Sequence, residues 1–354
     1  MKQITLFAVC ALFCATACNP IGNTGSGQET GSLVVSVKSG DEMSTKSNTD
    51  PTGKEAAIHD VQVFLFTQDG SLYRRETFGE NVVSQTVENI KPGYYTVIAV
   101  ANGPDLSSVK KRQDLEQARV TLGQNDPTKG FMMYGIDPNM VMVTSDTSHP
   151  ASSALVVRRQ VSRIRLTTVQ NLLPSDFGAL TVKSVFLANG LGAWNCSASG
   201  DPTEYVNYAG RKKGKSASTN QNDYIVSVAD AEYSALTFKD VNQSVTRSET
   251  PVSINVPLYT LPNKLAAASD HFDGATSDGA CTRLVLLVTY GTGNEPWYYP
   301  VTIPSLARNM SYDVSFTITG PGSKDPNQKV TNGNMNVDIT IDPWGNGSEI
   351  TGDF

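Results

Sequence analysis

Three histidines have the widest range of chemistry in this chain, because imidazole can act as a base or bind a metal. They are His59, His149 and His271. No two of them stand at the short spacing that places two ligands on one metal, and no serine or cysteine nearby carries the signature of a nucleophile. We expect these histidines to be solvated or structural. The sequence therefore predicts no catalytic residue, no metal and no cofactor.

Three other segments have residue types that bind ligands. The acidic, glycine-rich segment 270–279 could offer carboxylates to calcium, but it lacks the spacing of an EF-hand. The basic segment 211–215 could meet an acidic surface or a lipid head group. Trp194 and the aromatic run 297–299 could form a platform that stacks on sugars. The plainer interpretation is favoured in each case, with solvated loops for the charged segments and packing for the aromatic side chains.

Composition excludes further classes of protein. The chain has 354 residues, which at roughly 150 residues per domain predicts two domains. With 28 Lys+Arg against 34 Asp+Glu the net charge is −6, so the chain lacks the basic excess that nucleic acid requires. Only 18% of residues are charged, and Gly, Pro, Thr, Val and Tyr recur throughout. This composition favours an all-β protein over a helical one.

The amino terminus has the pattern of an export signal. An apolar run at 4–14 is about half as long as a membrane-spanning helix, and small residues lead from it to Cys18. We expect residues 1–17 to be a signal peptide and Cys18 to be acylated, because a cysteine in this place resembles a bacterial lipobox. The alternative is an ordinary cleavage site with an unmodified cysteine. Residues 18–30 are rich in Gly, Ser and Asn and are expected to form a flexible tether.

Two further cysteines fall inside the expected signal peptide, which leaves Cys196 and Cys281 to pair in an oxidising compartment. The sequence leaves two alternatives: one disulfide between Cys196 and Cys281, or two buried free thiols.

The remaining chain alternates apolar and polar residues in runs of four to eight, bounded by Gly, Pro, Asn and Asp, which is typical of sandwiches and barrels. One surface helix is expected at 104–116. Strands are expected at 33–38, 61–67, 84–87, 94–101, 154–159, 162–169, 180–188, 224–228, 252–259, 283–290, 298–303, 312–319 and 336–341.

Two segments of the chain resemble each other. In residues 33–70, and again in 164–190, one strand leads through a polar loop to a strand that ends in Phe-Leu and a glycine turn. We interpret this as a duplicated β-sandwich, with one domain at 31–160 and the other at 161–354.

Several strings, taken in order, resemble one family: the fimbrillins of type V pili made by Bacteroidales, of the FimA and Mfa type. The resemblance implies two tandem transthyretin-like, Greek-key β-sandwich domains and export as an outer-membrane lipoprotein. It further implies proteolytic removal of the first strand, polymerisation with other fimbrial subunits by donor-strand exchange, and adhesion to a host or bacterial surface ligand. The strings are Val-Phe-Leu-Phe-Thr-Gln-Asp-Gly (63–70), Gly-Tyr-Tyr-Thr-Val-Ile-Ala-Val-Ala-Asn (93–102), Met-Met-Tyr-Gly (132–135), Arg-Arg-Gln-Val-Ser-Arg-Ile-Arg-Leu (158–166), Arg-Asn-Met-Ser-Tyr-Asp-Val-Ser-Phe-Thr-Ile (308–318) and Val-Asp-Ile-Thr-Ile-Asp-Pro-Trp (337–344).

The first strand has the alternation of a groove-filling strand, because three apolar side chains share one face. These side chains are Leu33, Val35 and Val37. The loop that follows is polar and rich in turn-forming residues, so it is a site for proteolysis. By the resemblance, the cut that removes residues 31–46 follows Lys46, and Lys54 is the second candidate. The alternative is a loop that is never cut.

The last strand, at 335–344, repeats the alternation and is the expected donor strand. Its apolar face carries Val337, Ile339 and Ile341. The alternative is that both end segments are ordinary edge strands of their own domains. The leading hypothesis is thus a non-enzymatic fimbrial subunit, surface-exposed at the outer membrane and later part of the fimbria. The rival is a glycan-binding surface lipoprotein with the same tandem architecture.

Overall fold

The computed structural model of the chain describes residues 29–40, 54–188, 190–198, 204–206, 234–263, 282–303, 305–326, 328–330 and 333–344. Several sequence predictions lie outside the described residues: the signal peptide at 1–17, most of the tether at 18–30, Cys18, Lys46, Cys281, His271, the strand at 224–228 and the charged segments at 211–215 and 270–279.

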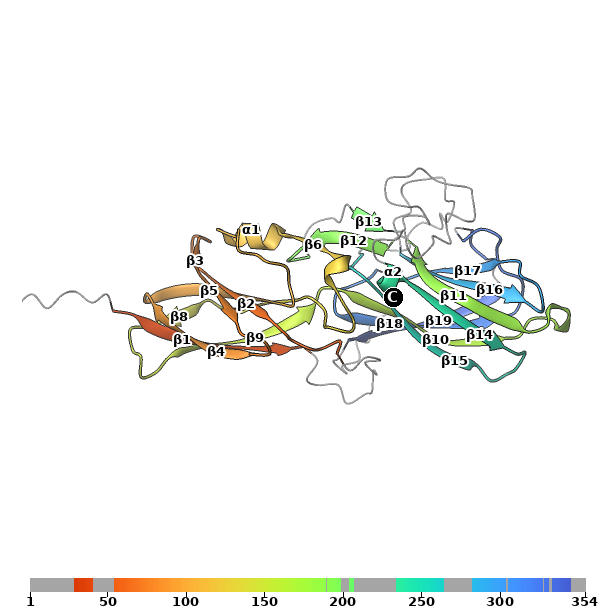
Figure 1. The fold of residues 1–354 in the computed structure, drawn as a ribbon, viewed down its shortest axis with the longest axis horizontal. Coiled ribbons are helices and arrows are strands. Elements are labelled where there is room, and N and C mark those ends of the chain that lie inside the picture. The colour runs from red at the N-terminus through yellow and green to blue at the C-terminus, as the bar shows by residue number, and fades with distance from the viewer. Residues whose placement is uncertain are drawn as a thin grey trace, which may run out of the picture.

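The first half of the chain forms one long sheet that curls around its own core (Figure 1). The strands are β1 (Gly31–Ser39), β2 (Val61–Phe66), β3 (Leu72–Phe78), β4 (Ser84–Ile90), β5 (Gly93–Ala101), β7 (Met133–Ile136), β8 (Val141–Val143) and β9 (Ala151–Arg159). They follow the order β3-β2-β5-β7-β9-β1-β4, and β8 pairs with β5. Arg74 on β3 donates a hydrogen bond to the Glu88 carbonyl on β4, so the two ends of the sheet come together.

Alternation along β5 explains why both faces of this sheet are covered. Tyr95 and Val97 face the inside of the curl and pack with core side chains of β1, β2 and β9. Ile98 and Val100 face outward and pack in a second cluster with Leu115. That cluster is supplied by α1 (Arg112–Gln117), β6 (Arg119–Thr121) and the segment before them.

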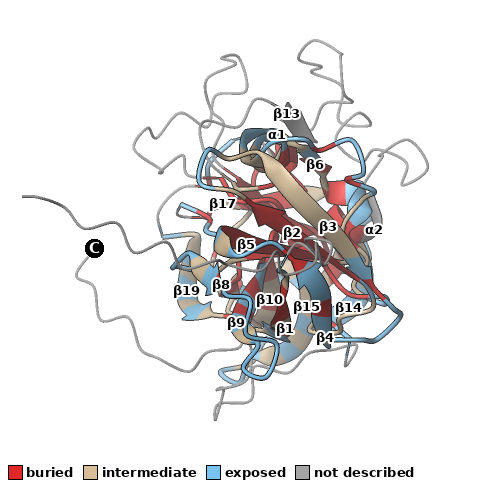
Figure 2. Cartoon of the chain, turned by 90° about the vertical axis from the view of Figure 1, so that its left-hand side faces the viewer, coloured by how far each residue is buried: buried red, intermediate tan, exposed pale blue. Residues whose placement is uncertain are grey.

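The second half of the chain is a sandwich of two four-stranded sheets with a shared core. The strands are β10 (Ser162–Asn171), β11 (Leu180–Ala188), β14 (Phe238–Val245), β15 (Val252–Thr260), β16 (Arg283–Tyr290), β17 (Trp297–Thr302), β18 (Met310–Ile318) and β19 (Met335–Pro343). One sheet has the order β15-β10-β18-β19 and the other β14-β11-β16-β17. Figure 2 shows the buried residues in the interior of the molecule, with exposed residues at its periphery.

The two halves repeat one pairing scheme. In the first half, β1 pairs in parallel with β9 and antiparallel with β4. In the second half, β10 pairs in parallel with β18 and antiparallel with β15. The strand β19, antiparallel to β18, is added at the edge of the second scheme. The chain passes from one scheme to the other between Arg159 and Ser162.

A small third sheet ties the halves together. The strands β12 (Gly190–Asn195) and β13 (Glu204–Val206) come from the second half, and β12 pairs with β6 of the first. Cys196, which follows β12, is buried in the outer cluster of the first half. The described helical elements are completed by α2 (Ser234–Thr237) and by 3₁₀ turns at Leu122–Gln124 and Ser175–Phe177.

The expected all-β fold with sandwich packing is confirmed, but the expected helix at 104–116 is mostly wrong. Only Arg112–Gln117 is helical. The side chain of Asp105 binds the Ser107 amide in a local turn, and the Lys110 carbonyl accepts the Leu72 amide, so neither group continues a helix. Several strands were not predicted because they are short, mix charged residues into the pattern or, in β12, contain two glycines: β3, β6, β7, β8, β12, β13 and β14.

Candidate functional site

The first strand lies in a deep groove. The side chains of Leu33 and Val35 are fully buried, and that of Val37 is 3% exposed. Each contributes on the order of 1.5–3 kcal/mol through the apolar area it removes from water. These three side chains form the buried face of β1, and loss of the strand would uncover the core of the first half.

Hydrogen bonding along β1 is two-sided. The strand pairs with β9 from Leu33 to Ser39 and with β4 from Gly31 to Ser36. A groove without β1 would expose unpaired backbone groups along both walls as well as apolar pockets. Such a groove is best filled by another extended segment with alternating apolar side chains.

Among the described residues, the terminal strand β19 pairs with a neighbouring strand on one side only. It pairs with β18 over its whole length, with Ile339 opposite Val314 and Val337 opposite Phe316. Its apolar residues Val337, Ile339 and Ile341 are half-buried against the core of their own domain. The structure thus shows the expected donor strand as an edge strand of its own sandwich, with its predicted apolar face turned inward.

The chain after residues 41–53 enters a buried cluster at the boundary of the two halves. We call Glu55, Arg159, Arg163, Tyr259 and Trp344 the junction cluster. The carboxylate of Glu55 is fully buried and accepts a 2.8 Å hydrogen bond from Arg163 Nη1 and a 3.0 Å bond from Trp344 Nε1. The Tyr259 hydroxyl also donates to it. Three side chains therefore donate hydrogen bonds to the Glu55 carboxylate.

Two guanidinium groups lie over the indole of Trp344. The Arg159 and Arg163 groups lie 4.4 Å and 4.9 Å from its ring centre, within the range of cation–π attraction. Arg159 Nε donates to the Glu55 carbonyl at 2.8 Å, and its Nη1 reaches the Trp344 carbonyl at 3.3 Å. The rings of Tyr259 and Phe131 pack on the same indole.

Burial lowers the pKa of Arg163, and the nearby charge of Glu55 acts against that shift. An ion pair this deep is sensitive to the loss of one partner, because the other charge is then left in an apolar site. The junction cluster joins the segment after the first strand, the boundary between the halves and the residue after the terminal strand. Glu55 was missed by the sequence analysis because a single glutamate after a polar loop has no periodic pattern.

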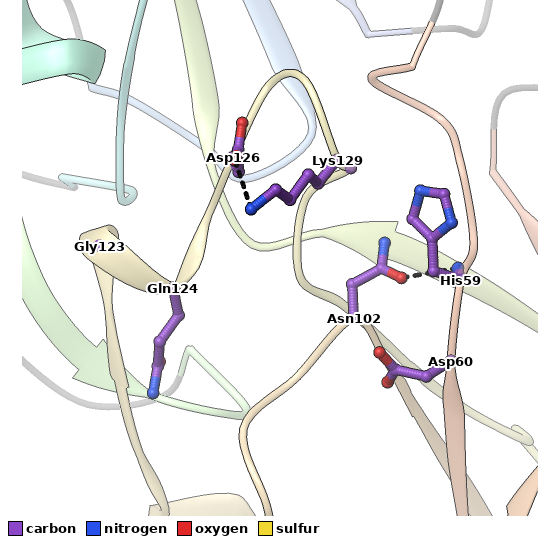
Figure 3. A pocket seen from close by; sticks show the side chains of 8 residues that line it. His59, Asp60, Asn102, Gly123, Gln124, Asp126 and Lys129 are labelled. Atoms are coloured by element: carbon purple, nitrogen blue, oxygen red, sulfur yellow. Dashed lines mark hydrogen bonds and ion pairs between the residues drawn. The ribbon is translucent and has the colours of Figure 1, made fainter. Parts of the chain in front are cut away.

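A cavity of about 500 Å³ lies beside the junction, lined in part by His59, Asp60, Asn102, Asp126 and Lys129 (Figure 3). The Asn102 side chain accepts the His59 amide and donates to two backbone carbonyls. Lys129 lies 3.7 Å from Asp126. Burial raises the pKa of Asp60. Much of the polar lining is thus engaged in holding the surrounding loops, and it offers no arrangement for a defined reaction.

The aromatic residues considered for a sugar platform are largely core residues. Tyr298 and Tyr299 are fully buried, and Trp194 is 8% exposed. Trp297 is half-buried, and the Lys324 ammonium lies 3.3 Å from its ring centre. This burial favours the interpretation that these aromatic residues pack in the core. They do not form the exposed aromatic cluster that would have supported glycan binding.

Cys196 is a buried free thiol, and burial raises its pKa to about 12. Cys281 lies outside the described residues, so both cysteine alternatives stay open. His149 is a loop residue whose ring lies 2.9 Å from Asp146. Within the described residues, no group of three or more His, Cys, Asp or Glu side chains is placed to hold a metal. None of the helices found there is long and apolar enough to cross a membrane.

Comparison with known proteins gives a consistent result. The sequence matches the family model of fimbrillin-A associated anchor proteins Mfa1 and Mfa2 over residues 27–348. The fold is similar to that of a candidate cell adhesion protein of Bacteroides eggerthii, with a TM-score of 0.65, 18% identity, and coverage of 89% of this chain and 96% of that one. It is also similar to the fimbrilin FimA of Porphyromonas gingivalis, with a TM-score of 0.60, 14% identity, and coverage of 91% and 99%. The comparison with curated proteins found no match.

Proposed function

The chain belongs to the family of fimbrillin-A associated anchor proteins Mfa1 and Mfa2, and from that premise we propose that it is an exported lipoprotein subunit of a surface fimbria that joins its neighbour by strand exchange. In this proposal Cys18 carries the lipid and holds the precursor at the outer membrane. Cleavage after Lys46 then frees β1, and a strand from another subunit takes its place. The protein acts as a structural part of the fimbria, through which the cell adheres, and not as an enzyme.

The observation that carries the proposal is the position of β1. Three core side chains lie on a strand joined to the body of the domain through a single connection, residues 41–53. After one cut in that connection, only non-covalent contacts hold β1. Its replacement conserves both the backbone pairing and the apolar filling of the groove, so exchange proceeds without net loss of structure.

Strand exchange can be tested with a reversible lock. Ser36 on β1 lies directly opposite Ser84 on β4, and both side chains point away from the core. The neighbouring bond from the Val37 amide to the Val83 carbonyl makes this the closely spaced kind of cross-strand pair. Its Cα separation of about 4.5 Å suits a disulfide. A Ser36→Cys, Ser84→Cys variant therefore locks β1 in place after the loop is cut.

Wild type and locked variant, both produced without residues 1–18, are treated with trypsin and followed by size-exclusion chromatography and gel electrophoresis. We expect the wild type to form a ladder of polymers after cleavage. The oxidised variant should be cut equally fast but remain monomeric until a reductant is added. Polymers formed equally well by the oxidised variant, or a cut wild type that keeps β1 and stays monomeric, would refute strand exchange at this groove.

The lipid anchor has its own test, because acylation depends on a single side chain. Labelling with a radioactive fatty acid should mark the wild type and leave Cys18→Ser unmarked and released from the membrane fraction. Membrane retention and labelling of the variant would remove Cys18 from this role.

A further inference from the structure

At one end of the first half, the outward face of its sheet exposes apolar side chains to solvent. Tyr94 on β5 and Met142 on β8 are cross-strand partners that are 48% and 54% exposed. Met140, two residues before Met142 and just ahead of β8, is 38% exposed. We call these three side chains the distal patch. Their neighbours Tyr95 and Val143 point into the core, so the patch results from the strand alternation and not from an unfolded end.

The same face is covered elsewhere. Further along β5, Ile98 and Val100 are fully buried beneath the outer cluster to which Leu115 of α1 belongs. That cover does not extend to Tyr94. An exposed group of tyrosine and methionine side chains beside an otherwise covered face points to a contact outside the chain.

The entry point of the chain lies at this end. A Cβ atom placed on Gly31 would stand 1.8 Å from the Thr144 carbonyl and 2.9 Å from a methyl group of Val143. The start of β1 therefore touches the end of β8, the strand that carries Met142. In Figure 1 the labels of β1 and β8 stand together at the end of the molecule that lies away from the second half.

The length of the tether sets the distance from this end to the lipid. Residues 19–30 join Cys18 to Gly31. A chain of twelve residues spans at most about 40 Å when fully extended. With the proposed acylation of Cys18, the end of the molecule that carries the distal patch stays within that distance of the bilayer.

We infer that the distal patch is a membrane-contact surface, and that Tyr94, Met140 and Met142 sit in the interfacial layer of the bilayer while the precursor is anchored. The inference rests on the proposed lipid anchor. Tyrosine favours this layer because its ring is apolar and its hydroxyl stays hydrated. The three side chains are uncharged, so contact does not require anionic lipid. The patch consists of three side chains, whereas a stable protein interface takes about 20–30 residues from each partner.

The test places a fluorescent reporter in the patch. Full-length acylated protein with Met142→Trp is reconstituted into phosphatidylcholine vesicles with or without bromine on the acyl chains, since bromine quenches tryptophan that it contacts. Wild type, whose three tryptophans supply the background, is measured in parallel. The matched control is Gln243→Trp, at an exposed position on β14 of the second half.

We expect brominated lipid to remove most of the emission added by Met142→Trp and none of that added by Gln243→Trp. Adding Cys18→Ser should abolish both vesicle binding and quenching. Vesicle-bound protein with an unquenched reporter at 142 would overturn the inference and leave the anchor standing. Protein that is neither acylated nor vesicle-bound would overturn the anchor and the inference together. Quenching that persists with Cys18→Ser would support membrane contact by the patch and overturn only its dependence on the anchor. A blue shift with protein concentration alone would identify a second copy as the occupant and overturn the inference.

Discussion

The indole N–H of Trp344 donates a 3.0 Å hydrogen bond to the carboxylate of Glu55, which joins the residue after the terminal strand to the segment that follows residues 41–53. In the sequence, β1 precedes residues 41–53 and Glu55 follows them. A cut after Lys46 would therefore release the first strand without breaking any contact of the junction cluster. The groove could open while the boundary between the two halves stays closed.

The first prediction concerns the energy of this cluster. Replacing Glu55 with Ala leaves the Arg163 guanidinium buried without its carboxylate. We expect the free energy of unfolding to fall by about 3–5 kcal/mol, because an uncompensated charge remains in an apolar site. Urea denaturation followed by tryptophan fluorescence measures this change. The control is Glu80→Ala at an exposed position, which should change stability by less than about 0.5 kcal/mol.

A double-mutant cycle separates the hydrogen bond from the ring packing. Trp344→Phe keeps an aromatic ring close to the two arginines but removes the N–H, and should destabilise by about 1.5–3 kcal/mol. Its effect should be much smaller in the Glu55→Ala background, since the two residues share one contact. Fully additive effects would contradict direct coupling between them.

The second prediction decides between the two lysines. The bond after Lys54 should resist trypsin, because a protease must bind several residues on both sides of the bond in extended form. The Lys54 carbonyl accepts the Ala57 amide in a turn, and the next residue, Glu55, is buried. Limited proteolysis with mass spectrometry should find the first cut after Lys46. Lys46→Gln should slow it strongly, whereas Lys54→Gln should not; the reverse order would show that the junction opens before processing.

The third prediction concerns the terminal strand. Ile339→Asp places a carboxylate on the half-buried face of β19, opposite Val314, whereas Asn336→Asp places one on the exposed face, opposite the uncharged Thr317. We expect the first change to lower the midpoint of urea unfolding and to reduce polymerisation after cleavage. The second should do neither, since its charge stays hydrated. Chromatography of the cut proteins gives the comparison, and equal polymerisation by both variants would exclude this face from strand donation.

The fourth prediction follows from the buried thiol. Burial raises the pKa of Cys196 from 9.0 to about 12, so the thiol should stay neutral and unreactive at pH 8. Native protein treated with iodoacetamide should remain unmodified at Cys196 until denaturant is added, as read by peptide mass spectrometry. Recovery of a peptide that joins Cys196 to Cys281 would instead establish the disulfide.

The same shift predicts a pH dependence of stability. The folded state favours the neutral thiol, so its contribution is fully present below pH 9 and is lost as the pH rises from about 9 to about 12. Across that range, Cys196→Ala should lose less stability than the wild type. Parallel loss in the two proteins would show that other groups account for the whole effect.

The sequence by itself determined the local features of this protein. Alternation of apolar and polar residues placed most of the strands and gave the buried face of β1 correctly, because side chains on a strand point alternately to its two sides whatever the strand pairs with. The order of short motifs indicated the family that the comparison confirmed. Short or charge-rich strands such as β3 and β8 carried too weak an alternation to be recognised.

Only the tertiary structure decided which segments meet. Leu33 pairs with Ala151 in a parallel register, and Glu55 meets Arg163 and Trp344, across separations in the chain that no local pattern records. The distal patch arises in the same way, since Tyr94 and Met142 become neighbours only when β5 pairs with β8. The physical reason is that a strand specifies its own two faces by covalent geometry, whereas its partners are selected by the packing and hydrogen bonding of the whole fold.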